Sequence, residues 1–154
     1  MIKKVAKIIF LILIFQFTPI FTSYAENTYI DSINTTAIIL PNGDMNVTQI
    51  WNTVSNDGSE WFIPVNNLNH MKLENFMVYE LDSGNIYPYE FSPTWDSSAS
   101  IETKSNKYSD YYNPQTGMRE LCFGKGKLGP KTFMLTWTYK NAVVKYTDNI
   151  IGFH

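Results

Sequence analysis

Apolar and polar side chains alternate along residues 132–139. Phe133, Leu135 and Trp137 share one parity, and threonines and a methionine occupy the other. A period of two is typical of a strand with one face in a hydrophobic core. The sequence therefore predicts a strand here, with Leu135 and Trp137 as core residues.

A shorter alternating segment precedes that strand and contains the only cysteine, Cys122, between Leu121 and Phe123. The residues that join the two segments, 124–130, are rich in glycine and end in proline, which is the composition of a turn. We therefore predict a β-hairpin near the centre of a sheet. A cysteine inside such a strand is expected to be buried and inert.

Several earlier segments also alternate, and polar turn residues separate them. The sequence Asn42-Gly43 is a strong hairpin signal because both residues tolerate a positive φ. Residues 92–118 are polar and irregular, so we expect an ordered but exposed excursion there, in which residues 101–108 form either one short strand or a helical turn. A weak final strand is expected over 142–151. This pattern predicts an all-β fold, an antiparallel β-sandwich of the immunoglobulin-like type. The earlier strands are predicted at residues 29–40, 45–54, 61–65, 76–81 and 86–91.

The first 25 residues have the composition of an export signal. Lys3, Lys4 and Lys7 precede an apolar run over 8–21, and the small residues Ser23 and Ala25 flank Tyr24. A basic start, an apolar run and a small-residue site define a secretory signal peptide. We predict cleavage after Ala25, an extracytoplasmic domain at 26–154 and a secreted or cell-envelope location. Retention of the segment as an uncleaved anchor is the alternative.

Charge narrows the range of partners. The signal takes three of the 12 basic residues and none of the 14 acidic ones, so the remaining 129 residues have a net charge of −5. A mildly acidic surface argues against nucleic acid and against an anionic membrane surface as partners. The expected partner is an envelope protein or a glycan, and contact with a membrane is expected only through the signal or a missing downstream segment. A single cysteine also excludes an intramolecular disulfide.

The sequence carries no recognisable catalytic set. His70 lies in a polar loop and His154 is the last residue, so neither is an obvious base for Cys122. The glycine-rich residues 124–129 lack the Gly-Lys-Ser/Thr ending of a phosphate loop, and the aspartates beside turns lack the spacing of a calcium loop. We therefore predict no catalytic residues, no cofactor and no metal.

Four aromatic residues stand out in the polar excursion, beside Tyr87 and Tyr89: Trp95, Tyr108, Tyr111 and Tyr112. Aromatic rings in polar loops can stack on sugars or form a contact patch, because each ring joins a large apolar area to a polar tip. We name these four as a possible ligand or partner surface. The alternative is that the rings fold back as a lid on the sheets.

The order of these segments resembles a known family. The chain is similar to the extracellular N-terminal domain of a bacterial predicted-membrane-protein family, domain of unknown function 2207. It departs from the family pattern at Gln49, where an acid is usual, and at Phe123, where Trp is expected. The resemblance implies a β-sandwich outside the membrane and no known activity. The segments that carry it are PNGDMNVTQIW, NDGSEWFIPVNNL, LENFMVYELDSGNIY, the lone Trp95 and ELCFGKGKLGPKTFMLTWTYKNAV.

Members of that family continue into transmembrane helices, whereas this sequence ends at His154. The expectation is a secreted stand-alone copy, a truncated gene product or a fragment. Two functional classes follow. The first is a non-catalytic extracytoplasmic interaction or sensor domain of the cell envelope. The second is a carbohydrate-binding module or a cell-wall-directed hydrolase, for which carboxylates gathered around Trp95 in a cleft would be the sign.

Overall fold

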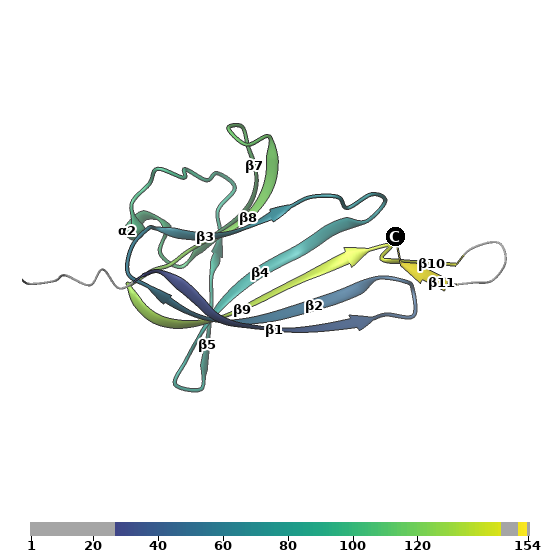
Figure 1. Cartoon of the computed structure of the whole chain (residues 1–154), viewed down its shortest axis with the longest axis horizontal. Coiled ribbons are helices and arrows are strands. Elements are labelled where there is room, and N and C mark those ends of the chain that lie inside the picture. Colours follow the sequence, from purple (N-terminus) through teal and green to yellow (C-terminus); the bar gives the residue numbers. More distant parts are fainter. Residues whose placement is uncertain (1–26, 146–150, 154) are drawn as a thin grey trace, which may run out of the picture.

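The computed structural model describes residues 27–145 and 151–153, so the predicted signal peptide and its cleavage site lie outside the described residues. Within them the chain is all-β, built mainly from a five-stranded and a four-stranded sheet, with one short helix, α2 (Figure 1). The predicted all-β class is therefore confirmed. The finer assignment as an immunoglobulin-like sandwich stays a prediction.

The five-stranded sheet has the order β1-β2-β9-β4-β5, and all neighbouring strands are antiparallel. The predicted Asn42-Gly43 turn joins its first two strands: Gly43 has a φ of +83°, and the side chain of Asn42 accepts a hydrogen bond from Asp44 N at 3.1 Å. Asp44 is thereby placed to pair with Lys140 at the end of β9. The strands are β1 (Tyr29–Ile39), β2 (Met45–Ser55), β9 (Gly129–Lys140), β4 (Lys72–Asp82) and β5 (Asn85–Pro88).

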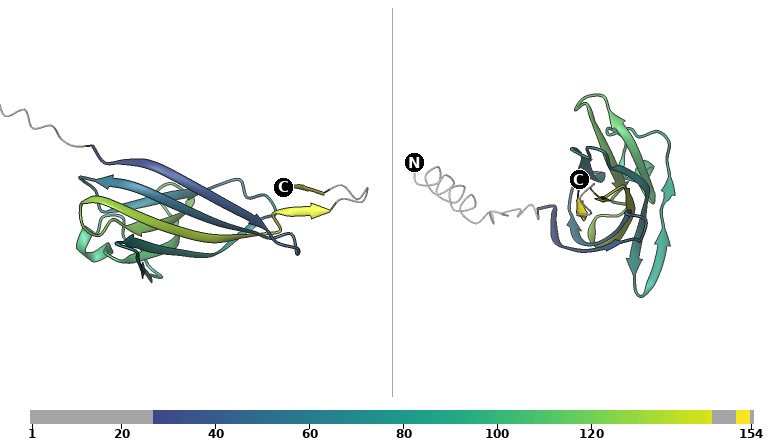
Figure 2. Two further views of the ribbon diagram at one scale, coloured as in Figure 1. Left: turned by 90° about the horizontal axis from the view of Figure 1, so that it is seen from below. Right: turned by 90° about the vertical axis from the view of Figure 1, so that its right-hand side faces the viewer.

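The four-stranded sheet has the order β3-β8-β7-β6, in which only the β6–β7 pair is parallel. A small hairpin of β10 and β11 extends from one end of the elongated molecule (Figure 2). The remaining elements are β3 (Glu60–Val65), β8 (Met118–Gly124), β7 (Lys107–Asn113), β6 (Glu90–Phe91), α2 (Ile101–Lys104), β10 (Val143–Lys145) and β11 (Ile151–Phe153).

The predicted hairpin of residues 121–123 with 132–139 is wrong. β8 pairs with β3 and β7, whereas β9 pairs with β2 and β4 in the other sheet. The rings of Phe123 and Phe133 meet edge to face across the core, with centroids 5.1 Å apart. Alternation correctly shows which face of β8 and of β9 lies against the core, but it carries no information about the strand's partner. The glycine-rich turn changes sheets, with Gly126 and Gly129 at φ of +68° and +110°.

The core lies between the two sheets and contains the predicted residues Leu135 and Trp137. Trp51 of β2 packs edge to face on Phe123 of β8, with centroids 5.7 Å apart, so the two sheets share one hydrophobic cluster. The remaining buried members of that cluster are Val47, Leu73, Phe76, Val78, Tyr89, Leu121 and Phe133.

The polar excursion also differs from its prediction. Residues 107–113 form β7, an interior strand between β8 and β6, whereas the helical turn expected as one alternative is present as α2 at 101–104. Residues 86–91 divide into β5 in one sheet and β6 in the other, because the chain leaves β4 after Pro88. The predicted strand over 142–151 is replaced in the described residues by the two short strands β10 and β11.

Candidate functional site

The outer face of the four-stranded sheet is covered by its own connection, residues 92–106. In β8, Leu121 and Phe123 belong to the core, so Glu120, Cys122 and Gly124 point to the outer face by the period of two. A Cβ on Gly124 would overlap the backbone carbonyl of Lys104, the last residue of α2. The absence of a side chain at this position therefore lets α2 lie directly on the sheet.

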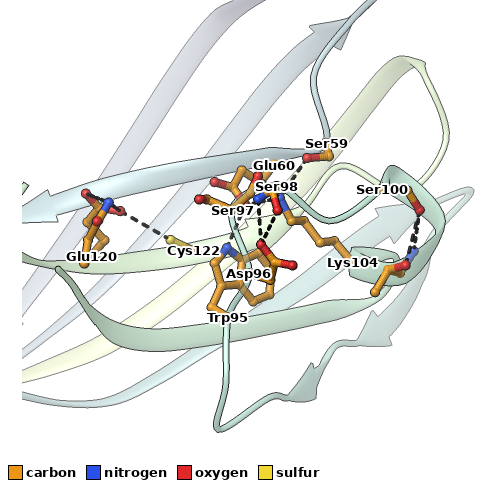
Figure 3. A network of polar contacts seen from close by, with 12 residues as sticks. Ser59, Glu60, Trp95, Asp96, Ser97, Ser98, Ser100, Lys104, Glu120 and Cys122 are labelled. Carbon is orange, nitrogen blue, oxygen red and sulfur yellow. Dashed lines mark hydrogen bonds and ion pairs between the residues drawn. The ribbon is translucent and has the colours of Figure 1, made fainter. Parts of the chain in front are cut away.

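A charged network fixes this covering segment to the sheet (Figure 3). Glu60 of β3 accepts a hydrogen bond from Trp95 Nε1 at 2.6 Å and pairs with Lys104 Nζ at 2.7 Å through the same oxygen, Oε2. Lys104 is only 3% exposed, and its ammonium also donates to Ser59 Oγ at 2.8 Å and to Ser97 O at 2.7 Å. We call these contacts the Glu60–Lys104 network. They satisfy a buried charge that would otherwise be costly.

Local hydrogen bonds shape the covering segment itself. Ser100 caps α2 by accepting from Thr103 N at 3.3 Å, as expected of a serine that precedes a helical turn. Asp96 accepts from the backbone and side chain of Ser98 at 2.9 and 2.6 Å, and these bonds lower the pKa of Asp96. The polar sequence that looks irregular is therefore a set of caps and turns that presents Lys104 to Glu60.

Cys122 is fully buried, as predicted, and lies on this same outer face. Its Sγ approaches Glu120 Oε2 at 4.0 Å, and Glu120 also accepts from Asn113 Nδ2 at 3.0 Å and from Thr116 Oγ1 at 3.1 Å. Burial, aided by the carboxylates of Glu60 and Glu120, raises the pKa of the Cys122 thiol far above its usual value. A protonated, enclosed thiol is a poor nucleophile.

A second lysine is buried where β8 ends. Lys125 Nζ lies 4.3 Å from the centroid of the Trp61 ring and donates to Asp57 O at 2.8 Å. Burial lowers the pKa of Lys125. These contacts tie the glycine-rich turn to the start of β3.

The structure places the four predicted aromatic residues in different environments. Trp95 is half-buried against Glu60, whereas Tyr108 packs between the rings of Phe76 and Phe91 at 5.6 and 5.5 Å. Tyr111 lies near Glu120 and Cys122, and burial with those groups raises the pKa of Tyr111 to about 12.

Among these four, Tyr112 is 66% exposed, whereas the other three rings are only partly exposed. Trp95 and Tyr111 lie on the outer side of the four-stranded sheet, and Tyr108 faces the core. The structure therefore does not bring the four rings together as one surface. Of the described carboxylates, Glu60 is the one that contacts Trp95, and it is neutralised by Lys104.

An open hollow of about 1200 Å³ lies elsewhere, beside the β4–β5 hairpin and the start of β1. Its lining includes Glu80 and Lys131, which pair at 2.6 Å, and Tyr89, whose hydroxyl donates to Glu80 at 3.2 Å. Burial and the Glu80 charge raise the pKa of Tyr89. Two exposed rings, Tyr29 and Tyr87, also line the hollow, so it combines aromatic surface with fixed polar groups. We call it the tyrosine hollow.

Sequence reasoning points to only part of this hollow, since Tyr87 and Tyr89 neighbour the aromatic set. Glu80 and Lys131 are far apart in the chain and meet because β4 pairs with β9, with Glu80 opposite Phe133. The sequence does not reveal the register of the β4–β9 pairing, so it could not predict that Glu80 and Lys131 meet.

Metal-binding clusters and membrane-spanning helices are both absent from the described residues. No three His, Cys, Asp or Glu side chains within residues 27–145 and 151–153 gather closely enough to hold a metal ion. In the same part of the chain, no helix has both the length and the apolar character that crossing a membrane requires.

Comparison with known proteins yields no match to a protein-family model, to a curated protein or to a solved structure. The resemblance to domain of unknown function 2207 accordingly stays a prediction.

Proposed function

We propose that this chain is a non-catalytic extracytoplasmic interaction or sensor domain of the cell envelope. The observation that carries the proposal is the tyrosine hollow, an open concave surface that presents aromatic rings beside an ion pair. Exposed tyrosines and a few fixed polar groups are typical of a surface that recognises a ligand. Glu80 within the hollow is held by Lys131 and Tyr89, which suits it to orient a ligand rather than to transfer a proton.

The chemistry of Cys122 supports a binding role in preference to covalent catalysis. Its thiol is enclosed and protonated, and it lies on the outer face of the other sheet. The proposal also includes the immunoglobulin-like sandwich architecture and membership of the family that the sequence resembles. Two sheets around one core are the arrangement expected of such a domain.

A carbohydrate-binding module is the second candidate, and the exposed rings of Tyr29 and Tyr87 favour it. Sugar rings present apolar C–H faces that stack on aromatic side chains and hydroxyls that bond to carboxylates and amides. Asp31 and Asn106 also line the hollow and supply such groups. The class of ligand expected here is therefore a neutral or weakly charged glycan of the cell wall.

Co-sedimentation of the protein with purified cell walls tests both candidates. Tyr29→Ala and Tyr87→Ala should each lower the bound fraction, whereas Tyr112→Ala, at least as exposed but outside the hollow, should leave it unchanged. Soluble cell-wall oligosaccharides should compete if the ligand is a glycan. Equal retention of all three variants would contradict a role for the tyrosine hollow, and release of new reducing ends would favour the hydrolase alternative.

Export is tested separately. Mass spectrometry of protein recovered outside the cytoplasm should find Glu26 as the first residue, because cleavage is expected after Ala25. Recovery of the chain with an intact Met1 in the membrane fraction would instead indicate an anchor.

A further inference from the structure

The two sheets have four edge strands, β1, β5, β3 and β6, and three of them are blunted. β3 contains Pro64, β5 is a four-residue strand that ends in Pro88, and β6 has two residues. Short edges and prolines are common means of preventing unwanted strand pairing. Proline also cannot donate a ladder hydrogen bond.

The fourth edge, β1, has none of these features along most of its length. It has 11 residues, contains no proline or lysine, and forms the rim of the larger sheet in Figure 1. Its single charged residue, Asp31, lies at a bulge between Ile30 and Ser32. Among the described elements, β1 is hydrogen-bonded to β2 alone.

The free edge of β1 also exposes large apolar side chains. Ile33 and Ile39 are opposite Trp51 and Met45 of β2, so they lie on the core side of the sheet, yet they are 44% and 51% exposed. An exposed apolar edge with unpaired backbone groups is suited to accept another strand. We propose that β1 pairs antiparallel with β1 of a second copy of this chain, so that two five-stranded sheets become one.

The hydrogen-bond pattern specifies which residues are available for this pairing. Leu40 N donates to Asp44 O across the β1–β2 turn. Because bonding directions alternate along an antiparallel strand, residues 33, 35, 37 and 39 direct their N–H and C=O groups away from β2. These groups point to the free edge and can form about eight hydrogen bonds with the same groups of a second strand.

A two-fold axis at Thr36 also places compatible side chains of the two copies opposite each other. It places Ile33 opposite Ile39 of the second copy, and Thr35 opposite Ala37, all on the core side of the joined sheet. Asp31 falls beyond the paired stretch 33–39, so the pairing brings no like charges together. A closed, self-complementary contact of this kind gives a dimer and not a fibre.

The choice of a second copy follows from this symmetry. The strand carries isoleucine three residues before and three residues after Thr36, so it complements itself in the antiparallel direction. The paired stretch is roughly 24 Å long, which places the interface at the small end of specific contacts. Dimerisation is therefore concentration-dependent. It is also separate from the tyrosine hollow, which involves only the residues of β1 that precede the paired stretch.

Sedimentation equilibrium of the full chain, as recovered from expressing cells, tests the proposal. The mass should rise from monomer to dimer between about 10 and 500 μM, as suits a weak interface. Ile39→Lys should keep the protein monomeric throughout that range. Ile86→Lys, which changes a residue 59% exposed at the tip of β5, is the matched control and should dimerise like the unchanged protein.

An engineered disulfide tests the register independently of affinity. Thr36 would face its own copy in a pair without mutual hydrogen bonds, where Cα atoms are about 4.5 Å apart, so Thr36→Cys should crosslink two chains on mild oxidation. Asn34→Cys should not, because its copies would be roughly 14 Å apart. The buried Cys122 should not react in either variant.

A protein that stays monomeric at about 500 μM would overturn the proposal. The free edge of β1 would then be available to pair with a strand of a different protein. A dimer that persists in Ile39→Lys and gives no crosslink with Thr36→Cys would overturn it as well, because the interface would then lie elsewhere.

Discussion

Gly124 and the carbonyl of Lys104 are in such close contact that no side chain fits between them. The contact joins the last outer-face position of β8 to the end of α2 and brings the Lys104 ammonium to Glu60. The sheet and the covering segment are thus held together both by close packing at Gly124 and by the Glu60–Lys104 ion pair.

Gly124→Ala should destabilise the protein by about 2–3 kcal/mol, because the new methyl group must push α2 off the sheet. Chemical denaturation measures the change in the free energy of unfolding. Gly84→Ala is the control, since open space surrounds Gly84 and only its φ of +81° opposes a side chain, at about 1–2 kcal/mol. Gly124→Ala has no such φ penalty, so a cost below about 1 kcal/mol would contradict the close packing of α2.

The sequence predicted the buried faces of the strands well. Phe133, Leu135 and Trp137 alternate with polar residues because the other face of β9 does not belong to the core, and a period of two detects that contrast. The pairing of β9 was not predictable in the same way. Its partners β2 and β4 come from earlier in the chain, and the adjacent β8 shows the same alternation while belonging to the opposite sheet.

β7 was missed for a related reason. Its core-side residue Tyr108 is partly buried, and the next residue, Ser109, is fully buried because the covering segment shelters the outer face. With both faces sheltered and serine and aspartate among its residues, the strand shows no hydrophobic contrast. The Glu60–Lys104 network was equally hidden, because its members come from β3, α2 and a loop and meet only after the sheet has formed.

Removing the Glu60 charge should weaken the covering segment. Glu60→Gln leaves the buried Lys104 ammonium without its carboxylate, which costs about 3–5 kcal/mol for a buried pair. Hydrogen exchange should also become faster across residues 95–104. Asp110→Asn is the control, because the Arg119–Asp110 pair is more exposed, at 35% and 26%, and its loss should cost clearly less than Glu60→Gln.

A double variant, Glu60→Leu with Lys104→Leu, checks that the loss of stability arises from the unpaired Lys104 ammonium. It should be more stable than Glu60→Gln, since both charges leave together. If Glu60→Gln cost no more than Asp110→Asn, the network would not hold the segment.

Trp137 should be a large contributor to the core. Trp137→Ala should cost about 3–5 kcal/mol, because it removes a large buried side chain and leaves a cavity between the sheets. Trp137→Phe should cost much less, since Trp137 Nε1 has no hydrogen-bond partner in the described part of the chain. By contrast, Trp51→Phe removes the donor to Gln49 Oε1 at 2.8 Å and should be the more costly phenylalanine variant. A loss under about 1 kcal/mol for Trp137→Ala would contradict its place in the core.

Cys122 and Tyr111, together with Tyr89, should make the protein less stable at alkaline pH. Burial raises the pKa of the thiol, and it raises the pKa of Tyr111 to about 12, so the unfolded chain releases both protons at lower pH than the folded protein does. Their contributions are therefore complete below about pH 8.5 and are lost as pH rises, first for the cysteine and above about pH 10 for the tyrosine. Cys122→Ala should make the free energy of unfolding less dependent on pH between about pH 8.5 and 10, and Tyr111→Phe should do so only above that range.

Thiol labelling of the native protein should be slow until denaturant is added. Rapid labelling of the native protein, or an unchanged pH profile in both variants, would place these groups in contact with water.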